Sequence, residues 1–363
     1  YKIMARQGKS TNDEVSFADV MLEKRCRKAQ NVFLNQVDRL IDWRPIRTLI
    51  NKKYTKRQNA AGAPAYDVIL LFKMLLLQTW YGLSDCALEE RVNDSVTFSR
   101  FLGLSMEAVS PDHSTISRFR TALTESGLMD KLLKAFNKQL SAHHISIKEG
   151  VLIDASIVDS PHRPDGILRI TVADDREDTR SDDEKDEEEA YHKFLLQERK
   201  GTDGEARWVK KKVYRYGYKK HVLTNREGII RQVITTPANR NDLKELIPLL
   251  REEDLPADTP VYADKGYATE ENRAFLTLHH LRDCIMHKAY RNRPLSQAQH
   301  LFNRSISPIR SVIERTFGSI RRWFDGGRCR YRGLAKTHTQ NILESIAFNL
   351  YRTPGLIISK CVK

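Results

Sequence analysis

Three carboxylates of this chain lie where a charged side chain is costly. Asp154 interrupts the apolar run at residues 151–158, and Asp264 closes the short apolar run at 261–264. Glu314 lies in residues 309–318, where apolar residues recur with helical spacing. Two acids on predicted strands and one on a later helix can converge on two divalent ions, and phosphoryl transfer on nucleic acid uses such an arrangement.

The ions expected at such a site are magnesium or manganese. Both prefer hard oxygen ligands and leave positions for water and phosphate. Two ions about 4 Å apart activate the attacking oxygen and stabilise the leaving one. Each acid taken singly is better explained as a cap, a turn or a surface residue. The order of the three acids on the predicted elements favours the metal site.

The chain around these acids predicts an α/β fold. From residue 150 onward the expected order is three strands, a helix, a strand, a helix, a strand and a helix. The full set of expected strands is 150–158, 213–223, 229–235, 260–264 and 283–287, and helices are expected near 242–251, 269–279, 308–322 and 339–352. This pattern predicts a mixed sheet with helices packed on it. Asp242 most simply caps a helix, although a peripheral place beside the ions stays open.

The residues before the sheet are expected to be helical. Residues 1–60 hold 14 Lys/Arg against 6 Asp/Glu and are predicted to form a basic N-terminal arm. Residues 61–147 are predicted to form an all-α domain, in which the apolar stretch from Val68 to Tyr81 is a buried helix because it is short for a membrane span. Short helices with tight turns are typical of a helix-turn-helix that binds DNA, and equally of ordinary helical domains.

Net charge indicates the class of binding partner, and cysteine content indicates the cellular compartment. The formal net charge of +14 over 363 residues favours a polyanion, against a basic cytosolic enzyme with no nucleic-acid role. The five cysteines include no Cys-x-x-Cys pair, which favours a reducing cytosol. Residues 174–189 hold 11 acidic and 3 basic residues and predict a solvated insertion, within about 163–205, rather than an acidic flap that competes with DNA.

Two basic regions are candidates for holding nucleic acid. Residues 207–221 combine seven Lys/Arg with four aromatics and no acid, which is typical of backbone contacts with base stacking, or of an edge hairpin with exposed lysines. Residues 291–336 hold 11 Lys/Arg and 2 Asp/Glu, so arginines flank Glu314 either at phosphates or on a solvated face. The candidate DNA-binding residues are Arg118, Arg120, Arg207, Trp208, Lys210, Lys211, Lys212, Lys219, Lys220, Arg310, Arg315, Arg321 and Arg322.

Six motifs occur along the chain in a specific order. They are residues 81–85 (YGLSD), 110–120 (SPDHSTISRFR), 153–156 (IDAS), 216–221 (YGYKKH), 263–267 (ADKGY) and Arg310-x-x-x-Glu314. Together they resemble the motifs of DDE transposases of bacterial insertion sequences, in the branch of insertion sequence five. The likeness covers about residues 30–355.

The resemblance implies a ribonuclease H-like catalytic domain at 148–355, with a mixed five-stranded sheet, flanking helices and the acidic insertion, followed by a tail at 356–363. Asp154, Asp264 and Glu314 correspond to the family's three metal-binding catalytic acids. Around the third acid the family has Tyr, two residues, Arg, three residues, Glu, six residues and Lys. The matching positions hold Ser307, Arg310, Glu314 and Arg321, so the tyrosine's role is not carried over to Ser307.

The function that the resemblance implies is DNA transposition with two Mg²⁺ or Mn²⁺ ions. Such an enzyme binds terminal inverted repeats, cleaves phosphodiester bonds at the element's ends and joins the freed 3′ hydroxyl to target DNA. The expected setting is a homodimer on DNA in the bacterial cytoplasm at the nucleoid, with no membrane and no small-molecule cofactor. The alternatives are a catalytically retired DNA-binding relative and a metal-dependent nuclease without strand transfer.

Overall fold

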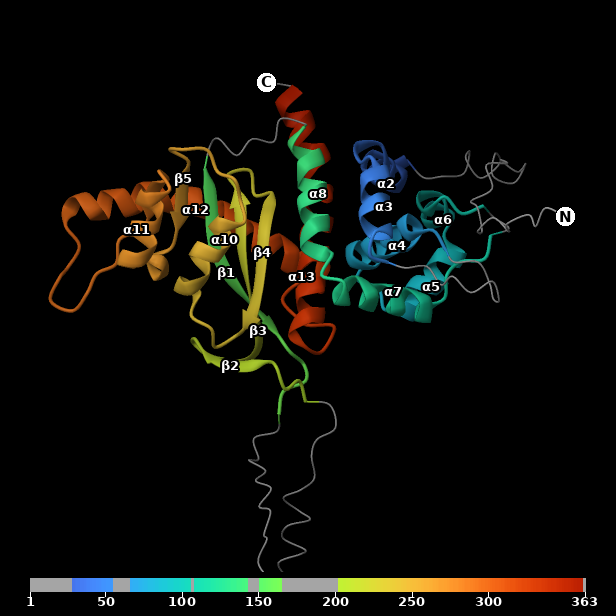
Figure 1. Cartoon of the computed structure of the whole chain (residues 1–363), viewed down its shortest axis with the longest axis horizontal. Coiled ribbons are helices and arrows are strands. Elements are labelled where there is room, and N and C mark those ends of the chain that lie inside the picture. The colour runs from blue at the N-terminus through green and yellow to red at the C-terminus, as the bar shows by residue number, and fades with distance from the viewer. Residues whose placement is uncertain (1–27, 55–65, 106–107, 143–149, 165–201, 362–363) are drawn as a thin grey trace, which may run out of the picture.

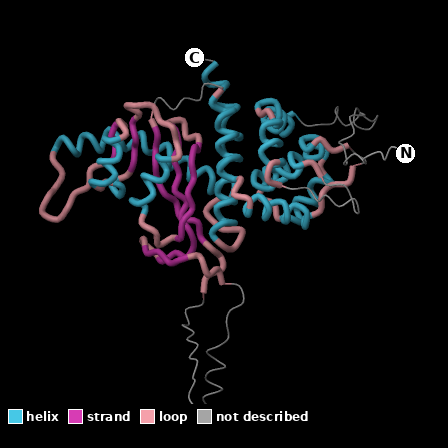
Figure 2. The backbone as a smooth tube through the Cα atoms, in the orientation of Figure 1, coloured by secondary structure: helices cyan, strands magenta, loops and turns pink. Residues whose placement is uncertain are grey.

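The structure is a computed structural model that describes residues 28–54, 66–105, 108–142, 150–164 and 202–361. Figures 1 and 2 show a group of short helices on the N-terminal side and, beside it, a sheet with helices on its faces. Helices α8 (Met129–Ser141) and α13 (Leu334–Cys361) lie between the two groups in Figure 1.

The sheet has the predicted mixed arrangement of parallel and antiparallel strands. Its main path runs β4-β3-β1-β5-β6, in which β3 pairs antiparallel with β4 and β1, and β1, β5 and β6 are parallel. These strands are β1 (Val151–Asp159), β3 (Tyr214–Asn225), β4 (Ile230–Pro237), β5 (Pro260–Ala263) and β6 (Arg282–Ile285). A sixth strand, β2 (Arg207–Lys210), pairs antiparallel with the start of β3, so the basic tract forms the hairpin that the sequence left open as one alternative.

Side-chain alternation along the strands divides the core between the two faces of the sheet. Val151 and Ile153 pack with α10 (Leu246–Arg251) and α11 (Glu270–Leu278), whereas Leu152 joins the cluster that contains α13 and α12 (Gln297–Phe324). Since side chains two residues apart point to one face, Asp154 shares the face of Leu152. The first candidate acid is therefore turned towards α12.

The helical part surrounds one apolar helix. As predicted, α4 (Val68–Tyr81) is buried along almost its whole length, and Asp67 caps it. The helices around it are α2 (Lys28–Leu40), α3 (Trp43–Asn51), α5 (Asp85–Asp94), α6 (Val96–Leu102), α7 (His113–Glu125) and α8. Residues 28–51, which the sequence placed in a basic arm, thus form two helices. None of the described helices has the length and apolar character needed to cross a membrane.

Helices α12 and α13 are longer than the sequence predicts. The expected start of α12 at residue 308 is wrong, because a capping box between Ser296 and Gln299 begins the helix and Pro308 lies inside it. Ile306, in the turn before the proline, is buried in the core. Similarly, α13 continues to Cys361 and takes up most of the expected tail at 356–363.

One polar and apolar interface joins the helical part to the sheet. On α13, Ala347 accepts a hydrogen bond from Trp80 Nε1 of α4 at 3.0 Å. Two residues further, Asn349 accepts from the Ile230 amide and donates to the Asn137 side chain of α8. Most of the buried residues of α4, α8 and α13 belong to one cluster. The helical part therefore does not have a separate core.

A buried ion pair anchors α13 to β3. Lys220 Nζ lies 2.7 Å from Glu344 Oε2, and the two side chains are 2% and 3% exposed. Lys220→Met should lower the free energy of unfolding by about 3–5 kcal/mol, because the Glu344 carboxylate would stay buried without a cation. Urea denaturation measures the loss, and adding Glu344→Leu should recover most of it.

The matched control is Arg282→Gln, which breaks the exposed pair between Arg282 and Asp258. It should cost less than about 1 kcal/mol because water screens that pair. Equal losses in the buried and exposed single variants would contradict a structural role for the Lys220 pair.

Candidate active site

Parallel pairing of β1 with β5 brings the first two acids together. Ile153 lies opposite Ala263 in the register, so Asp154 and Asp264 follow at adjacent positions. Asp154 Oδ1 accepts from the Ala155 amide at 2.8 Å. Asp264 ends its strand and caps the short helix η2 (Lys265–Tyr267), accepting from the Lys265 amide. Each carboxylate is thus oriented by the backbone amide that follows it.

The third acid reaches the same place from α12, which crosses this face of the sheet. One side chain of that helix, Arg310, contacts all three carboxylates. Its Nη2 lies 3.0 Å from Asp154 Oδ2 and 3.7 Å from Glu314 Oε1, and its Nη1 lies 3.5 Å from Asp264 Oδ1. The three predicted acids therefore meet around a single guanidinium, with Glu314 the most exposed at 62%.

The site is electrostatically strained by burial. Burial raises the pKa of the Asp154 carboxyl above its ordinary value, and the negative charge of Asp264 adds to the rise, while Arg310 opposes it. Burial, with the nearby charge of Asp154, also raises the pKa of the Tyr267 hydroxyl. That hydroxyl has no hydrogen-bond partner in the described part of the chain. Sequence patterns did not single out Tyr267, although it ends the 263–267 motif.

The donor atoms suit a hard divalent cation, since carboxylate oxygens are the ligands that magnesium and manganese prefer. Within the described residues, no three His, Cys, Asp or Glu side chains are yet close enough together to hold one ion. The positive charge among the acids is instead that of Arg310, whose side chain is only 12% exposed. Arg310 thus positions the acids rather than presenting itself to solvent.

Three of the candidate DNA-binding cations lie inside the protein, and the structure corrects their assignment. Arg120 pairs with Asp85, Lys219 with Asp242 and Lys220 with Glu344. All three side chains are buried, so they form ion pairs with internal acids and are not accessible to DNA. The pairing of Asp242 also explains why it is not the helix cap; Asn241 caps that turn instead.

Apart from Arg310, whose side chain lies among the acids, the other candidates lie at the surface. The exposed residues are Arg118, Arg207, Trp208, Lys210, Lys211, Lys212, Arg315, Arg321 and Arg322. On the β2–β3 hairpin, Trp208 is 42% exposed beside its lysines. Arg321 donates to Ser156 Oγ at 2.6 Å, two residues along β1 from Asp154. With Arg322 it lines a cleft of about 770 Å³ between the end of α12 and the α4–α5 turn. Arg321 is thus held beside the strand that carries Asp154.

The chain matches two family descriptions. The family described as Transposase DDE domain matches residues 146–350, and the one described as Transposase domain (DUF772) matches residues 21–122. The transposase for insertion sequence element IS1106 of Neisseria meningitidis serogroup B is 36% identical over 236 residues, which cover 65% of this chain and 76% of that protein.

Two solved structures are weakly similar. A piggyBac transposase synaptic complex with hairpin DNA has a TM-score of 0.46 at 10% identity, over 93% of this chain and 78% of that one. The Mos1 strand transfer complex has a TM-score of 0.19 at 11% identity, over 84% and 81%. At these scores neither likeness adds to the strand order described above.

His221, from the 216–221 motif, has a structural role. It is fully buried on β3, with Nε2 2.9 Å from Thr236 Oγ1. Burial lowers the pKa of His221 to about 4, against the smaller opposing effects of Asp242 and Glu245. The imidazole is therefore neutral in the folded protein at neutral pH.

His221 should make stability fall with acidity. Because the unfolded histidine titrates near 6.5 and the folded one near 4, the unfolded state takes up the proton first, and stability is lost as pH falls through that window. The free energy of unfolding of wild type and His221→Gln, measured against pH, should differ by a constant above about pH 7.5 and converge or cross below 6.5. A difference that does not change between pH 7.5 and 4 would contradict a buried neutral imidazole.

Proposed function

The chain belongs to the family of DDE transposases and is a DNA transposase, and from that premise we propose which residues carry its reaction. Asp154, Asp264 and Glu314 are the catalytic acids. The substrates are the terminal inverted repeats of a mobile element and a target DNA. The observation that carries this proposal is the guanidinium of Arg310, which lies within 3.7 Å of an oxygen of each acid. Membership of the branch of insertion sequence five stays a prediction.

Divalent metal dependence is general in DDE transposases, and the residues present fit it. Three carboxylates converge on one face, and the buried Tyr267 hydroxyl beside them has no described partner. We assign two Mg²⁺ or Mn²⁺ ions to Asp154, Asp264 and Glu314. When bound, such ions stabilise charge on phosphate oxygens and activate water. Burial of Asp154 strengthens these interactions by excluding solvent.

The proposed reaction has two displacements at phosphorus. Water attacks a phosphodiester at the element's end, the P–O3′ bond breaks, and a 3′ hydroxyl is released. That hydroxyl then attacks a phosphodiester of target DNA in line. The target's P–O3′ bond breaks, a target 3′ hydroxyl leaves, and the element's 3′ end is joined to the target's 5′ phosphate. Arg310 keeps the acids from repelling one another, and Arg321, held by Ser156, is placed to bind the strand that passes Asp154.

Exposed cations on several elements support a DNA partner. We assign backbone contacts to the hairpin lysines 210–212, to Arg322 on α12 and to Arg118 on α7. The helical part, 61–147 with the arm before it, would bind the inverted repeats, and a homodimer would pair two ends. The expected place of action is the bacterial nucleoid.

Asp154→Asn separates chemistry from binding. Cleavage of a duplex that carries the element's end should fall by about 10³-fold or more, the scale seen when one member of a catalytic unit is removed. End binding should persist, and stability should not fall, because the change removes a buried charge of raised pKa. Asp258→Asn, in an exposed pair, should cut normally.

The products made by the wild type distinguish the rival functions. Joined molecules support transposition, broken ends without joining indicate a nuclease, and binding without cleavage indicates a retired enzyme. Loss of binding and folding together in Asp154→Asn would mean that Asp154 is structural.

Chelation should have an equally selective effect. EDTA should stop cleavage and joining while end binding continues, since the surface cations need no metal. Calorimetric titration of Mn²⁺ into the DNA complex should saturate at about two ions per site, and Asp264→Asn should reduce that number. Full cleavage in EDTA would overturn the metal assignment.

A further inference from the structure

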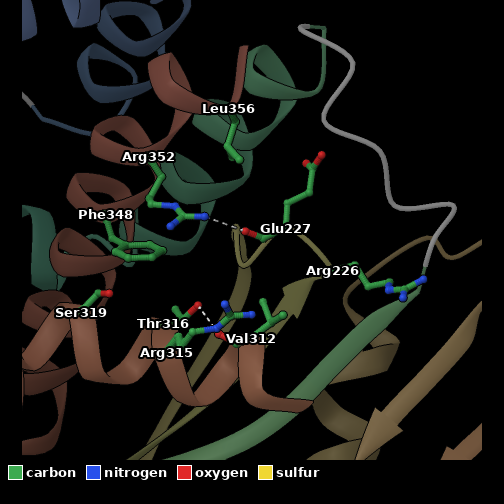
Figure 3. A pocket seen from close by; sticks show the side chains of 9 residues that line it. All are labelled: Arg226, Glu227, Val312, Arg315, Thr316, Ser319, Phe348, Arg352 and Leu356. Atoms are coloured by element: carbon green, nitrogen blue, oxygen red, sulfur yellow. Dashed lines mark hydrogen bonds between the residues drawn. The ribbon is translucent and has the colours of Figure 1, made fainter. Parts of the chain in front are cut away.

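A second basic pocket lies on another flank of α12. It encloses about 250 Å³ between α12, α13 and the turn that joins β3 to β4. Three arginines from these segments line it: Arg315 of α12, Arg352 of α13 and Arg226 of the turn (Figure 3). We call it the arginine pocket. Of the three, the reaction outlined above gives none a defined task.

The charges of this pocket are not neutralised within the described chain. None of the three arginines forms an ion pair there with a carboxylate. Arg315 Nε donates to the Ser311 carbonyl and Arg352 Nη2 to the Glu227 carbonyl, each at 3.3 Å. Backbone carbonyls thus orient the guanidiniums without cancelling their charge. Like charges gathered in this way repel one another until an anion joins them.

Figure 3 shows which side chains face the interior of the arginine pocket. Arg352 and Arg315 extend into the gap between α13 and α12, whereas the guanidinium of Arg226 and the carboxylate of Glu227 point away from it. Phe348 and Val312 supply an apolar wall. The space is therefore cationic on two sides and apolar on another.

Close packing fixes the turn that closes the pocket. Gly228 has φ of 84°, and a Cβ there would lie 2.9 Å from Thr316 Oγ1 on α12. Thr316 also donates to the Gly228 carbonyl at 3.4 Å. Any larger residue at this position would be strained by the backbone conformation and crowded against α12, so glycine lets the turn lie this near the helix.

We infer that the arginine pocket binds one backbone phosphate of the DNA strand being processed, with a deoxyribose against Phe348 and Val312. Guanidinium groups match phosphate oxygens in geometry as well as charge. Arg315 directly follows Glu314, about 100° further around the helix, so the pocket lies on the flank of α12 next to the one that carries the acid. The inference rests on the proposed function and adds to it a contact that fixes the strand's path.

A scan of single phosphates tests this contact. Each phosphate near the cleavage site of the end duplex is replaced in turn by an uncharged methylphosphonate. For wild type, one position should weaken binding by about tenfold. For Arg315→Gln with Arg352→Gln, the same replacement should have no further effect, and the salt slope of binding should fall by about 0.9 per lost contact. Arg315→Gln alone, at an exposed position, serves if the double variant unfolds.

Arg304→Gln is the matched control, because Arg304 is exposed on the same helix and does not line the pocket. It should keep the wild-type response at the identified phosphate. Coupling of that phosphate to Arg304 as strongly as to the pocket would overturn the inference.

Two other results would also overturn it. One is a wild type that binds and cuts the duplex with no phosphate coupled to Arg315 and Arg352. The other is that inorganic phosphate stabilises the wild type but not the double variant, while no DNA phosphate is coupled to the two arginines. That result would make the pocket a site for free phosphate. A wild type that neither binds nor cuts would instead refute the proposed function itself.

Discussion

The contact of one guanidinium with three carboxylates is the interaction on which the site depends. Parallel pairing of β1 and β5 brings Asp154 and Asp264 next to each other. Burial raises the pKa of Asp154, which disfavours its ionised form. Two adjacent carboxylates in such a place repel each other and need a cation. Arg310 supplies it from α12, and the same helix, four residues on, supplies the third acid.

Helix α13 joins the helical part of the protein to the sheet that carries the acids. α13 packs against β4 on one side and against α4 and α8 on the other, and the Lys220–Glu344 pair and Asn349 fix its polar contacts. The helical part is thereby joined to the catalytic sheet through one core. DNA held by the helices would then keep a defined position relative to the acids, which an enzyme that must cut at one phosphodiester requires.

Local patterns predicted much of this arrangement. Alternation and apolar runs identified the five strands of the main sheet path, the buried helix α4 and the three acids that meet at Arg310. They failed where the partner is distant in sequence. Lys219 and Lys220 lie in a tract that resembles a DNA-binding surface, yet their acids are 23 and 124 residues away. The arginine pocket has the same origin, because three far-separated segments each contribute one cation. The start of α12 was predicted eleven residues too late, because the capping box of Ser296 and Gln299 begins the helix upstream of Pro308.

The most direct test of the central claim is a crystal structure of the protein on its end DNA with Mn²⁺, in which anomalous scattering locates the ions. We expect two peaks about 4 Å apart, bound by carboxylate oxygens of Asp154, Asp264 and Glu314, with the scissile phosphate beside them. Manganese bound elsewhere, with Arg310 still between the three acids and DNA in place, would contradict it.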